Sequence, residues 1–573
     1  MKSFSIENSK RKNLTEFLIE KNELVISLAI FWGVTIIMLI YSLSLNNGHL
    51  IYTLDDAYIH MAIAKNFAKH GVWGVTRKEF SSSSSSLLYS LLLSLIFLFG
   101  VNEISPLIIN LVFANLLIYL IYTILKKNDV PSYAILLCLL LNIFLIPLHF
   151  LIFTGMEHVL QIYIDIIFIY YASLILSDEQ LKERILFSKN NKMTFSQDKL
   201  FFIIVPLVTL IRFEGMFFIV IVSAIFFLRK KIFYSTLVLG LGFLPIIIFG
   251  LISMSYGSFF FPNSVILKGN ISDITSISGI LNLLDFKQLI KNPHISIILI
   301  GAFLIFFLNY LEKKEIWNLK SIMASILILV AFLHLFLIGA TYENQNFSRY
   351  EGYLISIGLL VIFLSIRDYI PKTLSLDYLK LYITEIKKKT LNYKIQLITS
   401  LIVIFFIFYT FTPRSIYLIR RTPQASNNIY EQQYHMGLFL KEYYEGECVA
   451  VNDIGAINYL ADIECLDLRG LASTDIAKSI VNDELDEEVV YKAAKRRDCK
   501  IAIIYEDKDY GYDIPSQWTK VGEWKIKYNV VAGDDTVSFW AVDSDEIAEL
   551  IKNLQEFSDY LPHTVKESGN YTD

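Results

Sequence analysis

The chain has 573 residues, of which 54% are hydrophobic, 14% aromatic and 18% charged, with a formal net charge of −4. An average soluble protein has about 25% charged residues, and so small a net charge without a basic stripe argues against a nucleic-acid partner. Apolar runs recur from Leu24 to Thr412, whereas the remainder has the mixed composition of a globular domain. We therefore predict an α-helical polytopic membrane domain over residues 1–412 and a soluble α/β domain over residues 413–573.

The first apolar stretch runs from Leu24 to about Leu45 and follows several basic residues, Lys10, Arg11, Lys12 and Lys21. Since about twenty apolar residues cross a bilayer, this stretch is long enough to span one. No small-residue cleavage site follows it, so we predict a membrane helix that is not removed as a signal peptide.

Two adjacent aspartates, Asp55 and Asp56, stand just past this helix in the stretch TLDDAYIHMAIAKNFAKHG. The residues after them predict a helix. Aspartate is a favoured N-cap residue, so one of the two could serve only as a cap.

Six consecutive serines, Ser81 to Ser86, precede the apolar run Leu87 to Phe99. This run is short for a membrane span, and as a crossing it would invert every later segment. We therefore predict a re-entrant or interfacial helix on the outer side. A serine run can be a flexible linker; beside this helix we predict a mobile, hydroxyl-rich substrate loop.

Clusters of Lys and Arg favour the cytoplasmic side when they lie near the ends of membrane helices. Such clusters stand at residues 126–127, 182–199, 229–231, 313–320 and 367–394. Placing every cluster inside predicts eleven crossings of the cell membrane, with the N-terminus cytoplasmic and the C-terminal domain extracytoplasmic. The expected crossings are 24–46, 104–125, 131–150, 158–176, 200–211, 216–228, 232–252, 295–310, 320–340, 353–366 and 394–412. The short pair 200–211 and 216–228 would pack tightly around the stretch RFEG.

Carboxylates, arginines and amides collect in the loops of the predicted outer face. The loops are Asp55-Asp56, TGMEH (154–158), RFEG (212–215), YGSFFFPNSVILKG (256–269) and YENQNFSRYEG (342–352). An ionisable residue at membrane depth costs about 2.5–3.5 kcal/mol, which makes it a candidate for function. One polar loop would need no such explanation, but five on one face indicate a one-sided active site. A transporter would have repeated halves with charges near the midplane, and a channel would have rings or a filter; the sequence has none of these.

The C-terminal domain alternates helix-like and strand-like segments, which predicts a partly parallel sheet covered by helices. The expected strands are 448–453, 463–468, 499–507 and a hairpin of 520–531 with 535–543, and the expected helices are 430–444, 454–461 and 486–497. Residues from about Glu556 onwards are expected to be poorly ordered.

Two features of this domain bear on chemistry. The stretch NDIGA, which begins at Asn452 and includes Asp453, ends a strand and opens a helix, a position where ligands often bind in α/β sheets; plain strand-to-helix punctuation explains it equally well. Cys448, Cys465 and Cys499 lie at or near strand starts, and four cysteines in all are too few for a disulfide framework. We expect at most one bridge among the three, without a catalytic role.

An ordered set of motifs resembles those of GT-C membrane glycosyltransferases, which include protein O-mannosyltransferases, lipid A aminoarabinose transferases and mycobacterial arabinofuranosyltransferases. The motifs are TLDDAYIHMAIAKNFAKHG, SSSSSSLLYSLLLS, TGME, RFEG, YGSFFFPNSVILKG, AVNDIGAINYL and LDLRGLAS. The arabinofuranosyltransferase-like branch is the most similar, and the resemblance covers about Leu24 to Asp475. The chain departs from that branch at RFEG, where Pro more often follows Arg, and at the serine run, which leaves its substrate specificity open.

The resemblance implies a GT-C fold and a transferase with its active site on the outer face. Such an enzyme moves a sugar from a polyprenyl-phosphate-linked donor to a cell-envelope glycan, lipid or protein acceptor, usually with inversion. The alternatives are a polymerase or ligase of lipid-linked glycans and, as a non-enzyme, a flippase of these lipids. A flippase has no need of a base beside a helix end.

By the same resemblance, Asp55 occupies the position of the catalytic base, and its neighbour Asp56 is a second candidate catalytic residue. The acceptor hydroxyl loses its proton as it attacks the anomeric carbon, which requires a carboxylate within hydrogen-bond reach. Adjacent like charges raise one pKa of a pair, which suits a base.

The leaving group is a lipid phosphate, for which Arg offers bidentate contacts and Lys a point charge. We therefore expect substrate-binding residues among the outer-face set Glu157, Arg212, Glu214, Asn263, Lys268 and Arg349. Three alternatives stay open. Arg212 and Glu214 could neutralise each other, Lys268 could snorkel to the interface, and Arg349 could be merely interfacial.

Metal dependence is also left open by these residues. Glu157 stands where several GT-C families keep a second acid, sometimes as a metal ligand. No cofactor is therefore certain, and a divalent cation is compatible with the site. His60 and His158 are unpaired in any ligand spacing, so we predict no zinc site.

Overall fold

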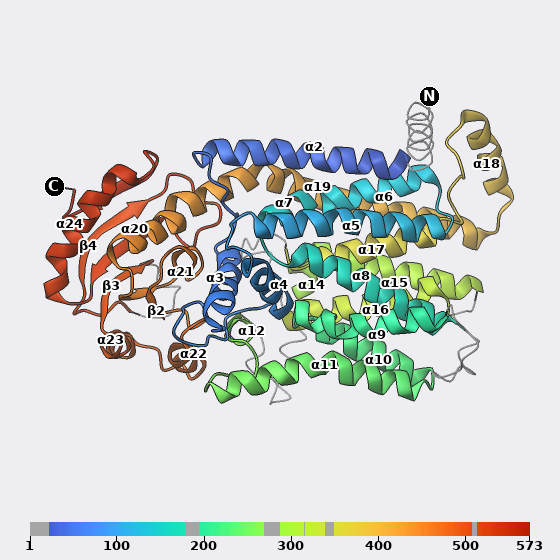
Figure 1. Ribbon diagram of the computed structural model, residues 1–573. Helices are drawn as coiled ribbons and strands as arrows, with labels where there is room; N and C mark the ends of the chain where they lie inside the picture. Colours follow the sequence, from blue (N-terminus) through green and yellow to red (C-terminus); the bar gives the residue numbers. More distant parts are fainter. Residues whose placement is uncertain are drawn as a thin grey trace, which may run out of the picture.

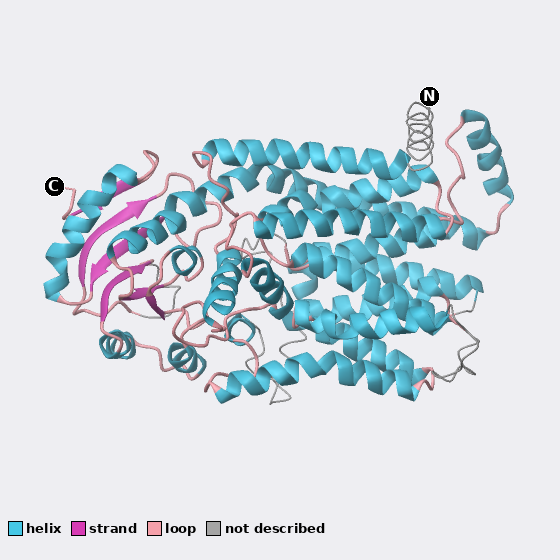
Figure 2. Ribbon diagram, viewed as in Figure 1, coloured by secondary structure: helices cyan, strands magenta, loops and turns pink. Residues whose placement is uncertain are grey.

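A bundle of long apolar helices and a C-terminal sheet domain stand end to end in the computed structural model (Figures 1 and 2). The structure describes residues 22–178, 194–268, 287–313, 316–338, 349–506 and 513–572. The basic cluster at 182–193 and the loop residues 342–348 lie outside the described residues. An α-helical polytopic membrane protein with a C-terminal α/β domain, as expected from composition, is confirmed.

Each of the eleven expected crossings coincides with a helix or a broken helix. The bundle helices are α2 (Asn22–Leu45), α5 (Ser105–Lys127), α6 (Ser132–Leu145), α7 (Leu148–Phe153), α8 (His158–Ser177), α9 (Thr194–Ile211), α10 (Gly215–Leu228), α11 (Ile232–Ser255), α15 (Pro293–Lys313), α16 (Leu319–Leu333), η2 (His334–Ile338), α17 (Gly352–Ile366) and α19 (Leu391–Ile429). Among the described residues, seven helices are long and apolar enough to cross a membrane, and four apolar helices are shorter.

Burial separates the centre of the bundle from its lipid-facing rim. All fifteen residues of α17 are buried, as expected for a helix that is apolar on every side. By contrast, α2 and α19 expose large apolar side chains such as Ile37 and Phe405. Apolar faces of this kind are stable when lipid covers them.

The crossing expected at 131–150 is broken in the middle, and this break positions the start of α8. Helix α6 ends at Leu145, two residues before Pro147, which lacks the N–H that would continue the helix. After the short α7 the chain turns at Gly155, whose φ is +67° and whose Cβ would lie 2.5 Å from the Tyr52 ring. Only glycine fits such a turn, and Glu157 follows two residues later.

The bundle joins the sheet domain without a loop. The boundary expected at residue 412 falls inside α19, which runs to Ile429 and continues as η4 (Tyr430–Tyr434) and α20 (His435–Tyr443).

The sheet has six strands in the order β2-β1-β3-β5-β4-β6. The strands are β1 (Cys448–Val451), β2 (Glu464–Asp467), β3 (Cys499–Ile504), β4 (Thr519–Lys525), β5 (Thr536–Ala541) and β6 (Lys566–Gly569). β1 pairs in parallel with β2 and β3, and the other pairs are antiparallel, so the sheet is partly parallel as predicted. The other elements of this domain are α21 (Ala456–Leu460), α22 (Thr474–Val481), α23 (Glu487–Arg496), η6 (Ser544–Glu546), α24 (Ile547–Phe557) and η7 (Ser558–Tyr560).

The prediction of a poorly ordered C-terminus is wrong. β6 pairs with β4, with Gly569 opposite Gly522. Leu561, Val565 and Tyr571 are buried in the core beneath this sheet, and their apolar area holds the segment in place. The signal is weak in the sequence because these apolar residues are widely spaced.

One disulfide links Cys448 of β1 to Cys499 of β3, which face each other in the parallel register. Cys465 is a buried thiol. The expectation of at most one bridge among the three cysteines agrees with this pairing.

Three short helices lie between the bundle and the sheet: α3 (Asp56–His70), α4 (Leu87–Phe97) and α12 (Asn263–Lys268) (Figure 1). The apolar run Leu87–Phe99 is thus placed at the end of the bundle that faces the sheet. The short α14 (Lys287–Lys291) completes the described helices of the membrane domain together with α18 (Leu376–Lys388).

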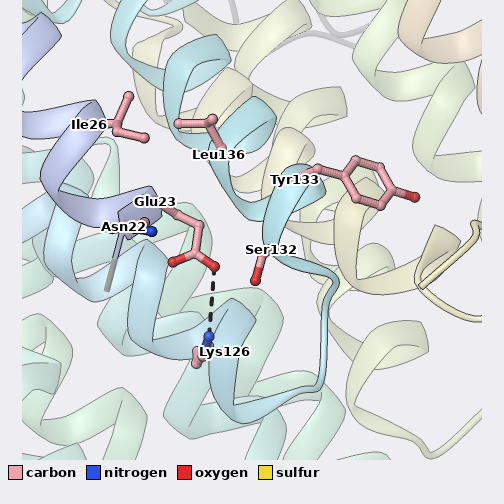
Figure 3. A pocket seen from close by; sticks show the side chains of 7 residues that line it. All are labelled: Asn22, Glu23, Ile26, Lys126, Ser132, Tyr133 and Leu136. Atoms are coloured by element: carbon pink, nitrogen blue, oxygen red, sulfur yellow. Dashed lines mark ion pairs between the residues drawn. The ribbon is translucent and has the colours of Figure 1, made fainter. Parts of the chain in front are cut away.

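The opposite end of the bundle carries the start of α2 and the crosswise helix α18 (Figure 1). Basic residues tie neighbouring elements together there: Arg229 donates to the Leu176 carbonyl at 2.9 Å, and Lys320 pairs with Asp368 at 2.8 Å. A pocket of about 300 Å³ lies between α2, α5 and α6 at this end, where Lys126 Nζ is 3.7 Å from Glu23 Oε1 (Figure 3). Its lining includes none of the outer-face residues singled out in the sequence.

Candidate active site

Asp56 and Arg349, which are 293 positions apart in the chain, meet at the sheet end of the bundle. Arg349 Nη2 lies 2.6 Å from Asp56 Oδ2. The Arg349 side chain is 5% exposed, so this arginine is a buried member of the site and not a merely interfacial residue. Asp56 is the first residue of α3, where the helix dipole also favours a negative charge.

Tyr350 joins Arg349 to Arg212. The Arg349 and Arg212 guanidinium groups lie 5.0 and 5.2 Å from the centroid of the Tyr350 ring. A guanidinium over an aromatic face is stabilised by the ring quadrupole. The two arginines therefore share one aromatic platform.

Arg212 is held by two carboxylates. Its Nη1 donates to Glu157 Oε1 at 2.5 Å, and its Nε and Nη2 make a bidentate contact with Glu214 at 3.0 and 2.6 Å. Arg212 and Glu214 form the ion pair that was predicted. Glu157 is a second carboxylate partner of the same arginine. Glu157 is completely buried, and an uncompensated carboxylate there would be strongly unfavourable.

The RFEG turn places this arginine for a steric reason. α9 ends at Ile211 and α10 begins at Gly215, so the two helices form a tight pair as predicted. A Cβ on Gly215 would lie 2.1 Å from the Val208 carbonyl oxygen. Glycine is required at this close approach.

Asp55 points toward the C-terminal domain. Its Oδ2 accepts from the Gly455 N–H and its Oδ1 from the Ala456 N–H, both at 2.8 Å. Asp55 makes no side-chain cap to its own helix α3; it caps α21 of the sheet domain. Each carboxylate oxygen keeps a second lone pair for another donor.

The NDIGA turn is shaped to receive this carboxylate. A Cβ on Gly455 would lie 2.1 Å from the Asp55 carbonyl oxygen and 2.6 Å from its carboxyl carbon. Lys65, further along α3, donates to the carbonyls of Asn458 and Tyr459 at the other end of α21. The short helix α21 is thus fixed to α3 at both ends.

Asp453 of the same turn affects the charge of Asp55. Asp453 Oδ2 accepts from Gln433 Nε2 at 2.8 Å and from the Tyr505 hydroxyl. Burial, and then the nearby Asp453, raise the pKa of Asp55 to about 8, although the two backbone donors lower it. A carboxyl group with a pKa near the working pH is suited to proton transfer.

Asn263 and Lys268 lie apart from this network. The Asn263 amide donates to the carbonyls of Gly470 and Leu471, and its backbone N–H donates to the Ser82 carbonyl. Asn263 therefore connects α12 to the sheet domain. The Lys268 side chain lies outside the described residues.

The site brings together five of the eight residues singled out from the sequence, Asp56, Glu157, Arg212, Glu214 and Arg349, with Asp55 adjacent along the chain. Sequence reasoning missed Tyr350, although it stands next to Arg349 in the stretch SRYEG. The sequence also left open whether the NDIGA stretch, with Asp453, binds a ligand or only connects a strand to a helix. The nearness of Asp453 to Asp55 favours a place in the site.

The carboxylates of this site do not fit a divalent cation in the observed arrangement. Asp56 is paired with Arg349 and Glu157 with Arg212. Over the described ranges, no three His, Cys, Asp or Glu side chains are grouped so that they could hold a metal ion.

Comparison with known proteins gives one family match. Residues 427–540, from the end of α19 into β5, match a family model described as Domain of unknown function (DUF8728). No curated protein matches the chain.

Solved structures of an archaeal enzyme are similar over most of the chain. One is the oligosaccharyltransferase AglB from Archaeoglobus fulgidus in complex with an inhibitory peptide and a dolichol-phosphate; it is 13% identical with a TM-score of 0.42, over 84% of this chain and 70% of that one. Another is an Archaeoglobus fulgidus oligosaccharyltransferase in complex with Zn and sulfate, 11% identical with a TM-score of 0.43, over 90% and 73% of the two chains. Both are described as oligosaccharyltransferases, not as arabinofuranosyl- or O-mannosyltransferases. Because both scores are below 0.5, we base the function on the residues of this site.

Proposed function

We propose that this chain is an integral membrane glycosyltransferase of the GT-C type, most similar to its arabinofuranosyltransferase-like branch. It transfers a sugar from a polyprenyl-phosphate donor to a cell-envelope acceptor outside the cytoplasm. One observation carries the proposal: acids from three loops meet two buried arginines in one network beside Asp55, at the end of the bundle that the sheet domain covers. Structural stability alone does not call for such a cluster, because burying charges in pairs is at best weakly stabilising.

Arg349 is the better of the two arginines for the donor phosphate. Its Nε has no hydrogen-bond partner among the described residues, whereas each nitrogen of Arg212 already contacts a carboxylate. Phosphate would bind Arg349 first and compete with Glu214 for Arg212. Glu214 is the more exposed of the two partners of Arg212.

Asp55 is the proposed general base. It accepts the proton of the acceptor hydroxyl while the hydroxyl oxygen forms its bond to the anomeric carbon. The bond from that carbon to the phosphate oxygen breaks, and its electron pair leaves with the polyprenyl phosphate. The two backbone donors from α21 hold the carboxylate in one orientation. Asp56 stays on Arg349 and positions it.

Donor binding tests the proposal without knowledge of the acceptor. Full-length protein in lipid nanodiscs should bind a radiolabelled polyprenyl phosphate, and Arg349→Ala should weaken binding at least tenfold, since a hydrogen bond to a charged group contributes about 1.5–3 kcal/mol. Lys320→Ala, which removes a cation at the opposite end, is the control and should bind normally. A panel of polyprenyl-phosphate pentoses and hexoses then identifies the sugar by consumption of the donor. Wild-type protein that binds no polyprenyl phosphate would rule the proposal out.

Orientation is a separate part of the proposal. A reporter fused after Asp573 should be active only when it lies outside the cytoplasm, because the basic loops are expected inside. A cytoplasmic signal from that fusion would overturn both the topology and the outer-face site.

A further inference from the structure

The serine run is a buried structural segment. Ser81, Ser82, Ser83, Ser84 and Ser86 are all nearly inaccessible to solvent. Their hydroxyls are used inside the fold: Ser84 Oγ donates to the Ser86 carbonyl at 2.9 Å and lies 3.1 Å from Ser90 Oγ. The prediction of a mobile, hydroxyl-rich substrate loop is therefore wrong, because these side chains are packed against neighbouring helices.

His60 stands between this run and the charge network. Its Nδ1 lies 2.9 Å from Ser90 Oγ and 3.4 Å from Ser84 Oγ. Its Nε2 lies 3.4 Å from Glu157 Oε2. The imidazole thus connects two serine hydroxyls on one side with the buried carboxylate on the other.

The neighbours of His60 determine which nitrogen carries the proton. A neutral imidazole has one donor nitrogen and one acceptor nitrogen, and burial lowers the pKa of His60, which favours the neutral form. Glu157 Oε2 accepts no hydrogen bond from the described residues and lies 3.4 Å from Nε2, so a proton on Nε2 faces an acceptor, while Nδ1 is placed to accept from a serine hydroxyl. Arg212 Nη1 donates to Glu157 Oε1, and His60 Nε2 lies within ion-pair distance of Oε2, so each oxygen of Glu157 faces a different side chain.

A second contact supports the same arrangement. The His60 ring packs edge-on against Tyr89, with centroids 5.7 Å apart, and the Tyr89 hydroxyl donates to the Gly155 carbonyl at 2.8 Å. Gly155 precedes Glu157 by two residues. The α3–α4 segment therefore fixes both the backbone turn before Glu157 and its side chain.

We propose that His60 is a positioning residue for the donor site: the serine run holds its Nδ1, its Nε2 holds Glu157, and Glu157 in turn sets the Arg212 guanidinium toward the donor phosphate. This inference rests on the proposed function and adds a residue that acts through Glu157 without touching the substrate.

Two substitutions separate the two sides of the ring. Gln places its amide nitrogen close to the position of Nε2, and Asn close to that of Nδ1. His60→Gln should therefore keep its contact with Glu157 and bind radiolabelled polyprenyl phosphate within a few-fold of the wild type. His60→Asn loses that contact and should bind about tenfold more weakly.

A double substitution tests whether the effect passes through Glu157. In a Glu157→Gln background, adding His60→Asn should change the affinity for polyprenyl phosphate no further, because the carboxylate is already gone. His149→Asn is the matched control: His149 of α7 is also buried, but it packs against Phe144 and should leave the affinity unchanged.

The outcomes distinguish this inference from the proposed function. Wild-type affinity in His60→Asn, equal losses in His60→Asn and His60→Gln, or additive losses with Glu157→Gln would each overturn the role of His60 while the donor site stands. Absence of polyprenyl-phosphate binding in the wild type would instead overturn the proposed function.

Discussion

The two ends of the helical bundle differ in how far their charged side chains are exposed to solvent. At the sheet end, Glu157, Arg212 and Arg349 are buried and each contacts a partner from another loop. At the opposite end, Lys126 and Asp368 are half exposed, although Glu23, the partner of Lys126, is buried. The amino acids are of the same types, so their difference lies in solvent access.

Exposed and buried charged residues therefore give different information about a membrane protein. Exposed lysines and arginines bear on topology, since they lie where water and lipid headgroups solvate them at little cost. Buried and paired charges cost several kcal/mol of desolvation, so their presence calls for a functional reason. Substitutions at the two ends should therefore differ sharply in effect, and the largest change is expected at the proposed base.

The strongest test replaces that base. Asp55→Asn keeps an acceptor oxygen for the α21 amides but cannot take a proton, so turnover should fall about 10²–10⁴-fold with donor binding near normal. The measurement is sugar transfer under single-turnover conditions. Asp129→Asn, an exposed aspartate at the opposite end, is the control. Wild-type turnover in Asp55→Asn would overturn Asp55 as the base. If Asp56→Asn were then inactive in sugar transfer, the base would be Asp56 instead.

Stability should separate the two ends as well. Glu157→Ala leaves Arg212 buried with a single partner, and breaking a buried ion pair costs about 3–5 kcal/mol. Asp368→Ala breaks the pair with Lys320, in which the aspartate is half exposed, and should cost at most about 1 kcal/mol. Thermal unfolding of both variants in the same detergent measures the contrast. Equal losses of stability in the two variants would mean that burial of the ion pairs does not distinguish the two ends.

The pH dependence of catalysis should reveal the influence of Asp453 on Asp55 across the domain boundary. Because the base must be ionised, kcat/KM should rise with pH through the raised pKa of Asp55, about 8. Asp453→Asn removes the neighbouring negative charge, lowers the pKa of Asp55, and should move this rise to lower pH. The pH profile of kcat/KM measures the shift, and Asp483→Asn, an exposed aspartate of the same domain, should leave the profile in place. An unchanged midpoint in Asp453→Asn would remove Asp453 from the site.

The same raised pKa has a consequence for stability. Between about pH 4 and pH 8 the native state binds more protons at Asp55 than the unfolded chain does, since the unfolded pKa is near the ordinary value. The contribution of Asp55 to stability is therefore greatest below this range and falls as the pH rises through it. Asp55→Asn should remove this part of the pH dependence in thermal unfolding.

The smallest effect on activity is expected at the disulfide, which joins two strands of the sheet away from the charge network. Changing Cys448 and Cys499 to Ser should leave sugar transfer unchanged for this reason. Stability should fall by about 2–4 kcal/mol, as is typical when a native bridge is lost. Cys465→Ser, which changes a buried thiol in the same sheet, is the comparison for packing effects. A loss of transfer with normal expression would contradict the absence of a catalytic role.

Local sequence signals were sufficient to identify the helices of the bundle and most of the sheet. Apolar runs of membrane length and alternating strand patterns act over a single element, and the expected elements formed where these signals stand. The acids Asp56, Glu157 and Glu214 were also identifiable, because each stands in a polar loop that meets an apolar run and, by the basic clusters, falls on the predicted outer face.

Which of these residues meet depends on how distant segments pack. Asp55 contacts Gly455, 400 positions away, and Arg349 contacts Asp56, 293 positions away. The serine run was misread for the same reason: its polar composition suggested a mobile loop, but its hydroxyls are satisfied inside the fold. Composition and periodicity describe the surroundings of a residue along its own helix or strand, whereas its hydrogen-bond and ion-pair partners are set by the packing of segments far apart in the chain.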